Sequence, residues 1–286
     1  MRRWLCLALA ACLLAGCSAV RLGYSNGETV AYWWLNSYVD LEAEQQPMVR
    51  RHLDNLFAWH RKTQLPDYAR ILKQAQQQLQ DNVSQADALA YVDIARKRGL
   101  AVFERALPEL TDLALSLDPQ QIEHLEKKFS ANNEKYRREY LRGDLEYRQQ
   151  YRFRKFLKQA EYWMGGFSGE QEAQLRRMSD ARPLDNELEL AARMQRQDAM
   201  IALLRRLQAE KPAREAAGRM IREYVDASLN YFGNEQHKAY YEKSREATAG
   251  MVAGMINNVA TPEQKGRALK RLQQWIDDSL SLAARA

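Results

Sequence analysis

Apolar side chains recur every three to four residues through most of this chain, which is the spacing of one face of an α-helix. Apolar stripes run through 49–60, 68–79, 84–110 and 269–280, and helical patterns also cover 119–163, 169–180, 184–209, 212–232 and 235–258. No segment shows the strict alternation of a half-buried strand. We therefore predict an all-α protein: an elongated bundle of about seven to nine helices with no sheet.

Capping and helix-breaking residues mark where these helices should begin, bend and end. Three capping boxes are predicted, in which a capping side chain and the residue three positions later satisfy each other's backbone N–H. They are Asp118 with Gln121, Ser168 with Gln171, and Thr261 with Gln264, and Ser84 with Asp87 is expected to open a further helix. Pro66 is expected in the first turn of a helix, and Pro108 is expected to bend one.

Glycines predict two further features of the bundle. Gly250 and Gly254, with Ala249 and Ala253, predict close packing of two helices. The pair at 165–166 ends a helix and leaves open whether the helices form one domain or two that hinge there.

The first sixteen residues have the features of an export signal. Arg2 and Arg3 precede an apolar run over 4–14, which is too short to span a membrane. The run ends in Leu14-Ala15-Gly16-Cys17, which resembles the bacterial lipobox. That resemblance implies that residues 1–16 are removed and that Cys17 receives diacylglycerol and an N-acyl chain such as palmitate. The alternative is an ordinary secretory signal that happens to precede a cysteine.

Removal of the signal would change the composition of the chain. The mature chain, 17–286, has a net charge of +4 and one cysteine, Cys17, whose sulfur the lipid occupies. Disulfides and thiolate metal sites are then excluded. Ser18 follows the lipidated cysteine, and in lipoprotein sorting a serine there permits transfer to the outer membrane. We expect a protein anchored by its lipid, facing the periplasm, with an aromatic-rich segment over 17–40 and a helical domain over 41–286.

The region behind the lipobox resembles an uncharacterised family of proteobacterial lipoproteins. The strings that carry the resemblance are RLGY at 21–24, YWWL at 32–35, YVD at 38–40, FAWHR at 57–61 and TQLPDY at 63–68. The resemblance implies the location and a helical fold, and it supplies no catalytic residue. The aromatic cluster of Tyr32, Trp33, Trp34 and Tyr38 could rest among lipid headgroups or form core, and core is favoured.

A basic segment over 135–158 contains nine Lys and Arg and three Asp and Glu. Four tyrosines of this segment fall on one side of a helix, and Arg137, Arg138, Arg142, Arg148 and Arg152 fall on the other. The favoured interpretation is a tyrosine seam with a solvated arginine face. The alternative is a face for an anionic envelope component or a protein partner, because guanidinium groups match phosphate and carboxylate. A nucleic-acid partner is not expected in an exported protein.

The sequence contains no catalytic or cofactor motif that singles out a site. The four histidines, His52, His60, His124 and His237, have no metal-ligand spacing, and no phosphate loop or dinucleotide fingerprint occurs. We expect no metal, no cofactor and a non-enzymatic binding or structural role. Two alternatives stay open. One is a periplasmic chaperone, since three helix starts resemble those of the CpxP/Spy group, and the other is a cell-wall hydrolase.

Overall fold

The computed structural model describes residues 19–285, and within this range the chain forms eleven α-helices and no strand. The predicted all-α class is confirmed. The helices are α2 (Ala19–Ser25), α3 (Gly27–Val39), α4 (Gln46–Gln78), α5 (Gln85–Ser116), α6 (Pro119–Tyr140), α7 (Leu145–Met164), α8 (Gly169–Asp180), α9 (Asn186–Glu210), α10 (Arg214–Leu229), α11 (Glu235–Gly254) and α12 (Pro262–Ala283). A 3₁₀ turn (Tyr231–Gly233) precedes α11 and a π-helical turn (Met255–Val259) follows it.

The expected number of seven to nine helices is wrong, because three additional helices outweigh one merger. The merger joins the two stripes before residue 80 into one helix of 33 residues, α4, with Pro66 inside it and Pro47 in its first turn. The pattern over 119–163 is split at 141–144, where Gly143 adopts a left-handed φ of 73° and Asp144 caps α7. The segment before residue 40 adds α2 and α3.

All three predicted capping boxes are present and reciprocal, and Ser84 with Asp87 forms a fourth at the start of α5. Two of them also join helices that are distant in sequence. Gln264 donates from Nε2 to the Gly166 carbonyl at 2.7 Å, and Gln171 donates from Nε2 to the Val259 carbonyl at 2.7 Å. These bonds fix the start of α12 against the linker between α7 and α8.

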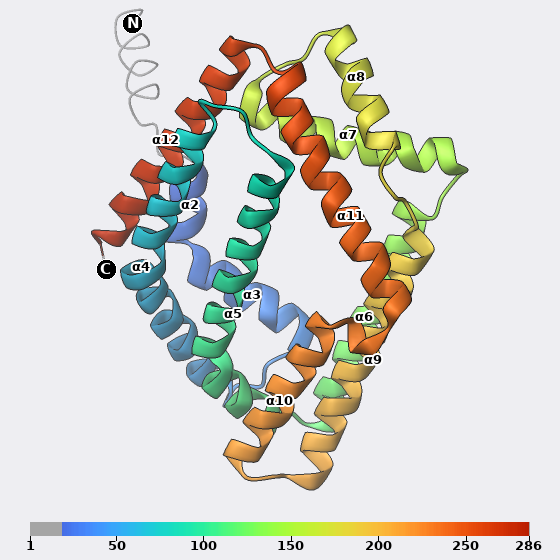
Figure 1. Cartoon of the computed structure of the whole chain (residues 1–286). Coiled ribbons are helices and arrows are strands. Elements are labelled where there is room, and N and C mark those ends of the chain that lie inside the picture. The colour runs from blue at the N-terminus through green and yellow to red at the C-terminus, as the bar shows by residue number, and fades with distance from the viewer. Residues whose placement is uncertain (1–18, 286) are drawn as a thin grey trace, which may run out of the picture.

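The helices pack into two hydrophobic cores. The first core joins α3, the start of α4, the end of α5, α6, α9 and α10, and Leu207 and Ala217 are fully buried in it. The second joins the end of α4 with α7, α8, the π-helical turn and α12, around the fully buried Leu175. In Figure 1, α12 lies along α4, and α11 crosses the molecule on the other side of α5.

The predicted signal peptide, 1–16, and Cys17 lie outside the described residues. No helix within 19–285 is long and apolar enough to cross a membrane. At the Gly165–Gly166 pair, Arg267 of α12 donates from Nε to the Met164 carbonyl at 2.8 Å. The end of α7 and the linker that follows are therefore tied to α12 at the carbonyls of Met164 and Gly166.

Candidate ligand-binding pocket

A pocket of about 660 Å³ lies beside the second core and is lined by residues from five helices. We call it the apolar pocket. Its walls are built by the end of α4, the start of α5, the second half of α7, most of α11 with the π-helical turn, and α12. A volume of this size falls within the range of small-molecule sites, which are concave and mainly apolar.

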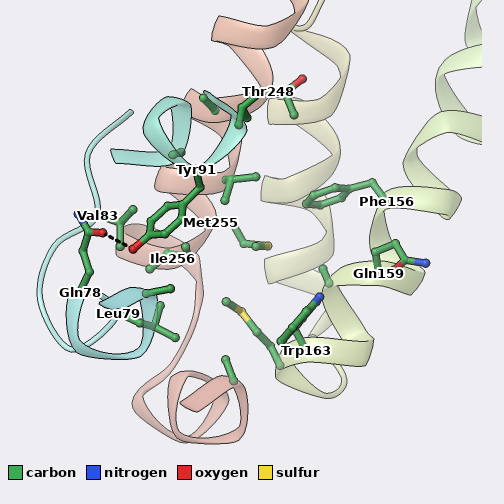
Figure 2. A pocket seen from close by; sticks show the side chains of 18 of the residues that line it. Gln78, Leu79, Val83, Tyr91, Phe156, Gln159, Trp163, Thr248, Met255 and Ile256 are labelled. Atoms are coloured by element: carbon green, nitrogen blue, oxygen red, sulfur yellow. Dashed lines mark hydrogen bonds between the residues drawn. The ribbon is translucent and has the colours of Figure 1, made fainter. Parts of the chain in front are cut away.

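One wall comes from a single face of α7. Phe156, Ala160, Trp163 and Met164 line the pocket and follow the i, i+4, i+7, i+8 spacing of that face. Figure 2 shows Phe156 and Trp163 reaching into the pocket from the same helix. Since Ala160 stands between two large aromatic side chains, the wall has a recess at its centre rather than a flat surface.

The opposite wall is formed by Leu79, Val83, Met255 and Ile256 (Figure 2). Its shape depends on a clamp between segments that are 174 residues apart in sequence. Asn257 of the π-helical turn donates from Nδ2 to the Val83 carbonyl at 2.8 Å and accepts from the Val83 N–H at 3.0 Å. π-helical turns are rare and occur frequently at functional sites.

The small residues of α11 explain why space remains beneath this helix. Ala249 lines the pocket, and the neighbouring Gly250 and Gly254 face Gln85 of α5 and Met178 of α8. A β-carbon at Gly254 would come too close to the end of the Met178 side chain, whereas one at Gly250 would make only ordinary contact with Gln85. The short side chain of Ala249 leaves space open opposite the aromatic side chains of α7, and this space is part of the apolar pocket.

Few polar groups reach the pocket, and most already have partners. Tyr91 donates from Oη to Oε1 of Gln78 at 3.0 Å (Figure 2), and Thr248 donates to the Ser244 carbonyl at 2.6 Å. Burial raises the pKa of Tyr91, so its hydroxyl stays neutral. The only charged side chain among the lining residues is Arg245, whose Nη1 lies 3.1 Å from Oδ1 of Asp93. The pocket therefore suits a ligand that is apolar along most of its length.

The five arginines of the basic segment are not presented on one helix, because the break at 141–144 assigns Arg137 and Arg138 to α6 and the rest to the linker and α7. Three of the five have partners within the molecule. Arg137 pairs with Glu134 at 2.5 Å, and Arg148 pairs with Glu187 at 2.7 Å. Arg152 donates to the Ser179 and Pro183 carbonyls, each at 2.6 Å, and so satisfies the end of α8.

Arg138 and Arg142 are exposed and make no ion pair with the described residues. The tyrosines of the segment do contact one another across the break, since Tyr136 stacks on Tyr140 at 4.5 Å and Tyr140 meets Tyr151 edge-on at 5.3 Å. The anionic-partner hypothesis stays a prediction, and among the five arginines it rests on these two exposed ones.

The aromatic cluster near the N-terminus divides between core and surface. Tyr32 is buried beneath the guanidinium of Arg50, as the core interpretation predicts, but Trp33 and Trp34 of α3 are 66% and 61% exposed. Adjacent positions on a helix point about 100° apart, so one face of α3 packs on α4 while these two indoles face outward.

The histidines occupy packing or surface positions. The Tyr24 hydroxyl and Nδ1 of His60 share a hydrogen bond of 2.8 Å. Burial raises the pKa of Tyr24 to about 12 and lowers the pKa of His60, which makes the hydroxyl the donor and a neutral imidazole the acceptor. Within the described range no three His, Cys, Asp or Glu side chains are grouped so that they could hold a metal ion.

A family model matches residues 37–215, which is more than half of the chain, and its description is a family of unknown function (DUF6279). The chain belongs to this family. The DUF6279 match contains the α4, α5 and α7 walls of the apolar pocket, whereas α11, the π-helical turn and α12 follow it. No curated protein and no solved structure matches the chain. The predicted membership of an uncharacterised family is thus confirmed.

Sequence reasoning missed the apolar pocket entirely. Its lining residues were assigned to ordinary helix stripes, because an apolar residue that lines a pocket has the same spacing as one in a filled core. The pocket arises only where α7, α11 and α12 come together around a space that their side chains do not fill. The one local feature that could have pointed to it is the run of small residues in α11 opposite the aromatics of α7.

Proposed function

We propose that this chain is a lipid-anchored, non-enzymatic binding protein of the bacterial cell envelope, and that it holds an apolar ligand in the apolar pocket. The observation that carries the binding role is the pocket itself, with a volume of about 660 Å³ and walls made of Phe156, Trp163, Leu79, Ile256 and similar side chains. Filling such a space removes apolar surface from water on both ligand and protein, which is the main source of affinity for ligands of this kind.

A binding role accounts for the pocket better than catalysis does. Among the polar side chains at its wall, Tyr91 is bonded to Gln78, Thr248 to the Ser244 backbone carbonyl, and Arg245 to Asp93. An acid–base or nucleophilic mechanism needs a reactive group with a free path to the substrate and a second group to activate it. The described pocket lining contains no carboxylate, histidine or cysteine.

The envelope location rests on the lipobox and on the position of the exposed indoles. Helix α2 begins at Ala19, two residues after Cys17, and leads through a turn at Asn26 into α3. Val30, Trp33 and Trp34, which we call the α3 patch, are each more than 60% exposed. Indole rings favour the headgroup region of a bilayer. In this proposal Cys17 carries diacylglycerol and palmitate in the outer membrane, and the α3 patch rests on its periplasmic surface.

The binding role can be tested by blocking the pocket at one position of α5. Ala88 lines the apolar pocket, and Ala90 lies two residues further on, on the opposite, exposed side of the same helix. Nile red, a neutral apolar probe that fluoresces when shielded from water, is titrated into the full chain and each variant. Ala88→Phe should lower probe affinity about tenfold because the ring occupies the binding volume. Ala90→Phe, the matched control, should bind as the wild type does.

Equal binding by the wild type and Ala88→Phe would overturn the proposed site. If Ala88→Phe fails to fold, as judged by circular dichroism, Val92→Phe replaces it. Val92 lines the pocket one helical turn away from Ala88 and is 44% exposed, so its ring can be accommodated.

The membrane arrangement has its own test. Full chain reconstituted into vesicles with brominated lipid should show quenched tryptophan fluorescence. Trp33→Ser with Trp34→Ser should remove most of the quenching, whereas Trp275→Phe, which changes an indole that packs on Trp163, should not. Quenching that survives the double change would show that α3 does not rest on the membrane surface. The pocket hypothesis would be unaffected.

A further inference from the structure

A second pocket adjoins the apolar pocket and differs from it in chemistry. This polar pocket, of about 310 Å³, lies where α10 ends and α11 begins, and Arg96 of α5 closes one side of it. It shares two lining residues, Tyr241 and Arg245, with the apolar pocket. The two pockets therefore border the same turn of α11, with mainly apolar walls in one and charged side chains in the other.

The polar pocket carries an excess of positive charge. Its lining contains the cations Arg96, Lys238 and Arg245 and the carboxylates Glu235 and Glu242. Lys238 lies 3.8 Å from Glu235, which is a long and exposed ion pair, and Arg96 makes no ion pair with any described carboxylate. Exposed pairs of this kind contribute little and can be exchanged for a better partner.

Arg245 stands at the junction of the two pockets. Its present partner is Asp93, and both side chains are about half exposed. A guanidinium group donates two parallel hydrogen bonds to a carboxylate or phosphate, and such contacts gain strength when one side is apolar. Arg245 could thus hold an anionic group at the edge of the apolar pocket, since it lines both pockets.

The backbone beside this junction is held in an uncommon conformation. Tyr231, Phe232 and Gly233 have left-handed φ values of 53°, 51° and 72° in succession. Such a conformation is costly for aromatic residues, and it is found most often at binding and active sites. Its result here is that the Tyr231 ring stacks on Tyr241, with centroids 5.2 Å apart and planes 7° apart. This stack forms a rigid edge between the two pockets.

We infer that the ligand is an amphiphile with a single acyl chain and an anionic head group, its chain in the apolar pocket and its head group in the polar pocket, against Arg96, Lys238 and Arg245. This inference rests on the proposed function and names the class of ligand. A single long acyl chain fits the volume, because about 660 Å³ equals roughly 22 water volumes and a methylene group takes up about as much space as a water molecule. A free fatty acid and a lysophospholipid share this chemistry.

The test compares three ligands of equal chain length by native mass spectrometry of the full chain released from a non-ionic detergent. They are palmitate, palmitoyl lysophosphatidylglycerol and the neutral monopalmitoylglycerol. We expect both anionic ligands, or one of them, to bind about tenfold more tightly than the neutral one. Whichever anion binds more tightly identifies the head group as carboxylate or phosphodiester.

The variants assign this preference to the polar pocket. Combined Arg96→Gln, Lys238→Gln and Arg245→Gln should abolish the preference for the anion and leave the neutral ligand's affinity unchanged. Arg222→Gln is the matched control, because Arg222 is an exposed arginine that pairs with Glu104 of α5, much as Arg245 pairs with Asp93. This control should retain the full preference.

The outcomes separate this inference from the proposed function. Binding of all three ligands with equal affinity, or an anionic preference that survives the triple change, would overturn the head-group assignment while the apolar pocket remained a binding site. No binding of any ligand, together with no effect of Ala88→Phe on Nile red, would overturn the proposed function itself. If the triple variant does not fold, Arg245→Gln alone is compared with Arg222→Gln.

Discussion

Lengthening the acyl chain of the ligand should tighten binding by a constant factor for each added methylene group until the apolar pocket is full. Burial of one methylene is worth about 0.8 kcal/mol, which corresponds to roughly fourfold in affinity. Each newly ordered bond of the chain costs part of that gain, so a factor between about two and four is expected. The pocket of about 660 Å³ then sets the end of the series, because it holds roughly 20 chain carbons.

The assay measures the affinity of the full chain for saturated fatty acids of increasing length. Fatty acids also partition into detergent more strongly as they lengthen, so the free concentration of each is determined in the same detergent without protein. The logarithm of the affinity, plotted against the number of carbons, should rise linearly and then level off by about 20 carbons. In Ala88→Phe it should level off at a shorter chain, because the ring takes up part of the volume.

Two results would refute this reasoning. Affinity that does not change with chain length would show that the chain does not enter the pocket. Affinity that continues to rise well beyond 20 carbons, equally in the wild type and in Ala88→Phe, would indicate adsorption to the exposed surface of the molecule rather than binding in the apolar pocket.

Three further predictions concern stability and the basic segment. Gln264→Ala should lower the free energy of unfolding in urea by about 1–3 kcal/mol, because it removes a buried side chain that bonds the Gly166 carbonyl and the Thr261 N–H. The exposed Gln274→Ala should change this free energy by less than about 0.5 kcal/mol, and equal effects would contradict the role of the capping network. Burial lowers the pKa of His60 below its usual 6.5, so as the pH falls the imidazole is protonated in the unfolded chain before it is protonated in the folded one. The contribution of His60 to the free energy of unfolding should therefore be greatest above pH 6.5 and should decline as the pH falls through the lowered pKa. His60→Gln should reduce this decline, measured by urea unfolding at several pH values. An unchanged decline would show that other titrating groups cause it. Arg138→Gln with Arg142→Gln should leave the fold intact and, if this face has an anionic partner, weaken salt-sensitive binding to anionic vesicles; unchanged binding would mean that the face is only solvated.

Those features of the fold that depend on short stretches of sequence could be predicted. The capping boxes at Ser84, Asp118, Ser168 and Thr261 are all formed, because a capping side chain and its partner lie three residues apart and need nothing from the rest of the molecule. Pro66 shows the limit of local rules. It is a plausible first-turn proline, but α4 continues through it, because both ends of this helix are packed into hydrophobic cores.

The candidate site could not be predicted, since it depends on contacts between distant segments. Asn257 and Val83 are joined by two hydrogen bonds across 174 residues, and neither has a sequence context that indicates a partner. The polar pocket likewise brings Arg96 of α5 beside Lys238 and Arg245 of α11. Sequence reasoning directed attention instead to the arginines of 135–158, where charge is dense along the chain, and three of those five serve intramolecular bonds.

The central claim, that an apolar chain occupies the apolar pocket, is tested most directly by photo-crosslinking. A palmitate analogue with a diazirine at the end of its chain is bound to the full chain and irradiated, and the modified residues are identified by peptide mass spectrometry. The account predicts modification of α7 near Phe156 and Trp163 and of the π-helical turn near Met255 and Ile256, reduced by excess palmitate and by Ala88→Phe. Modification confined to the α3 patch would contradict this claim, and so would modification that neither excess palmitate nor Ala88→Phe reduces.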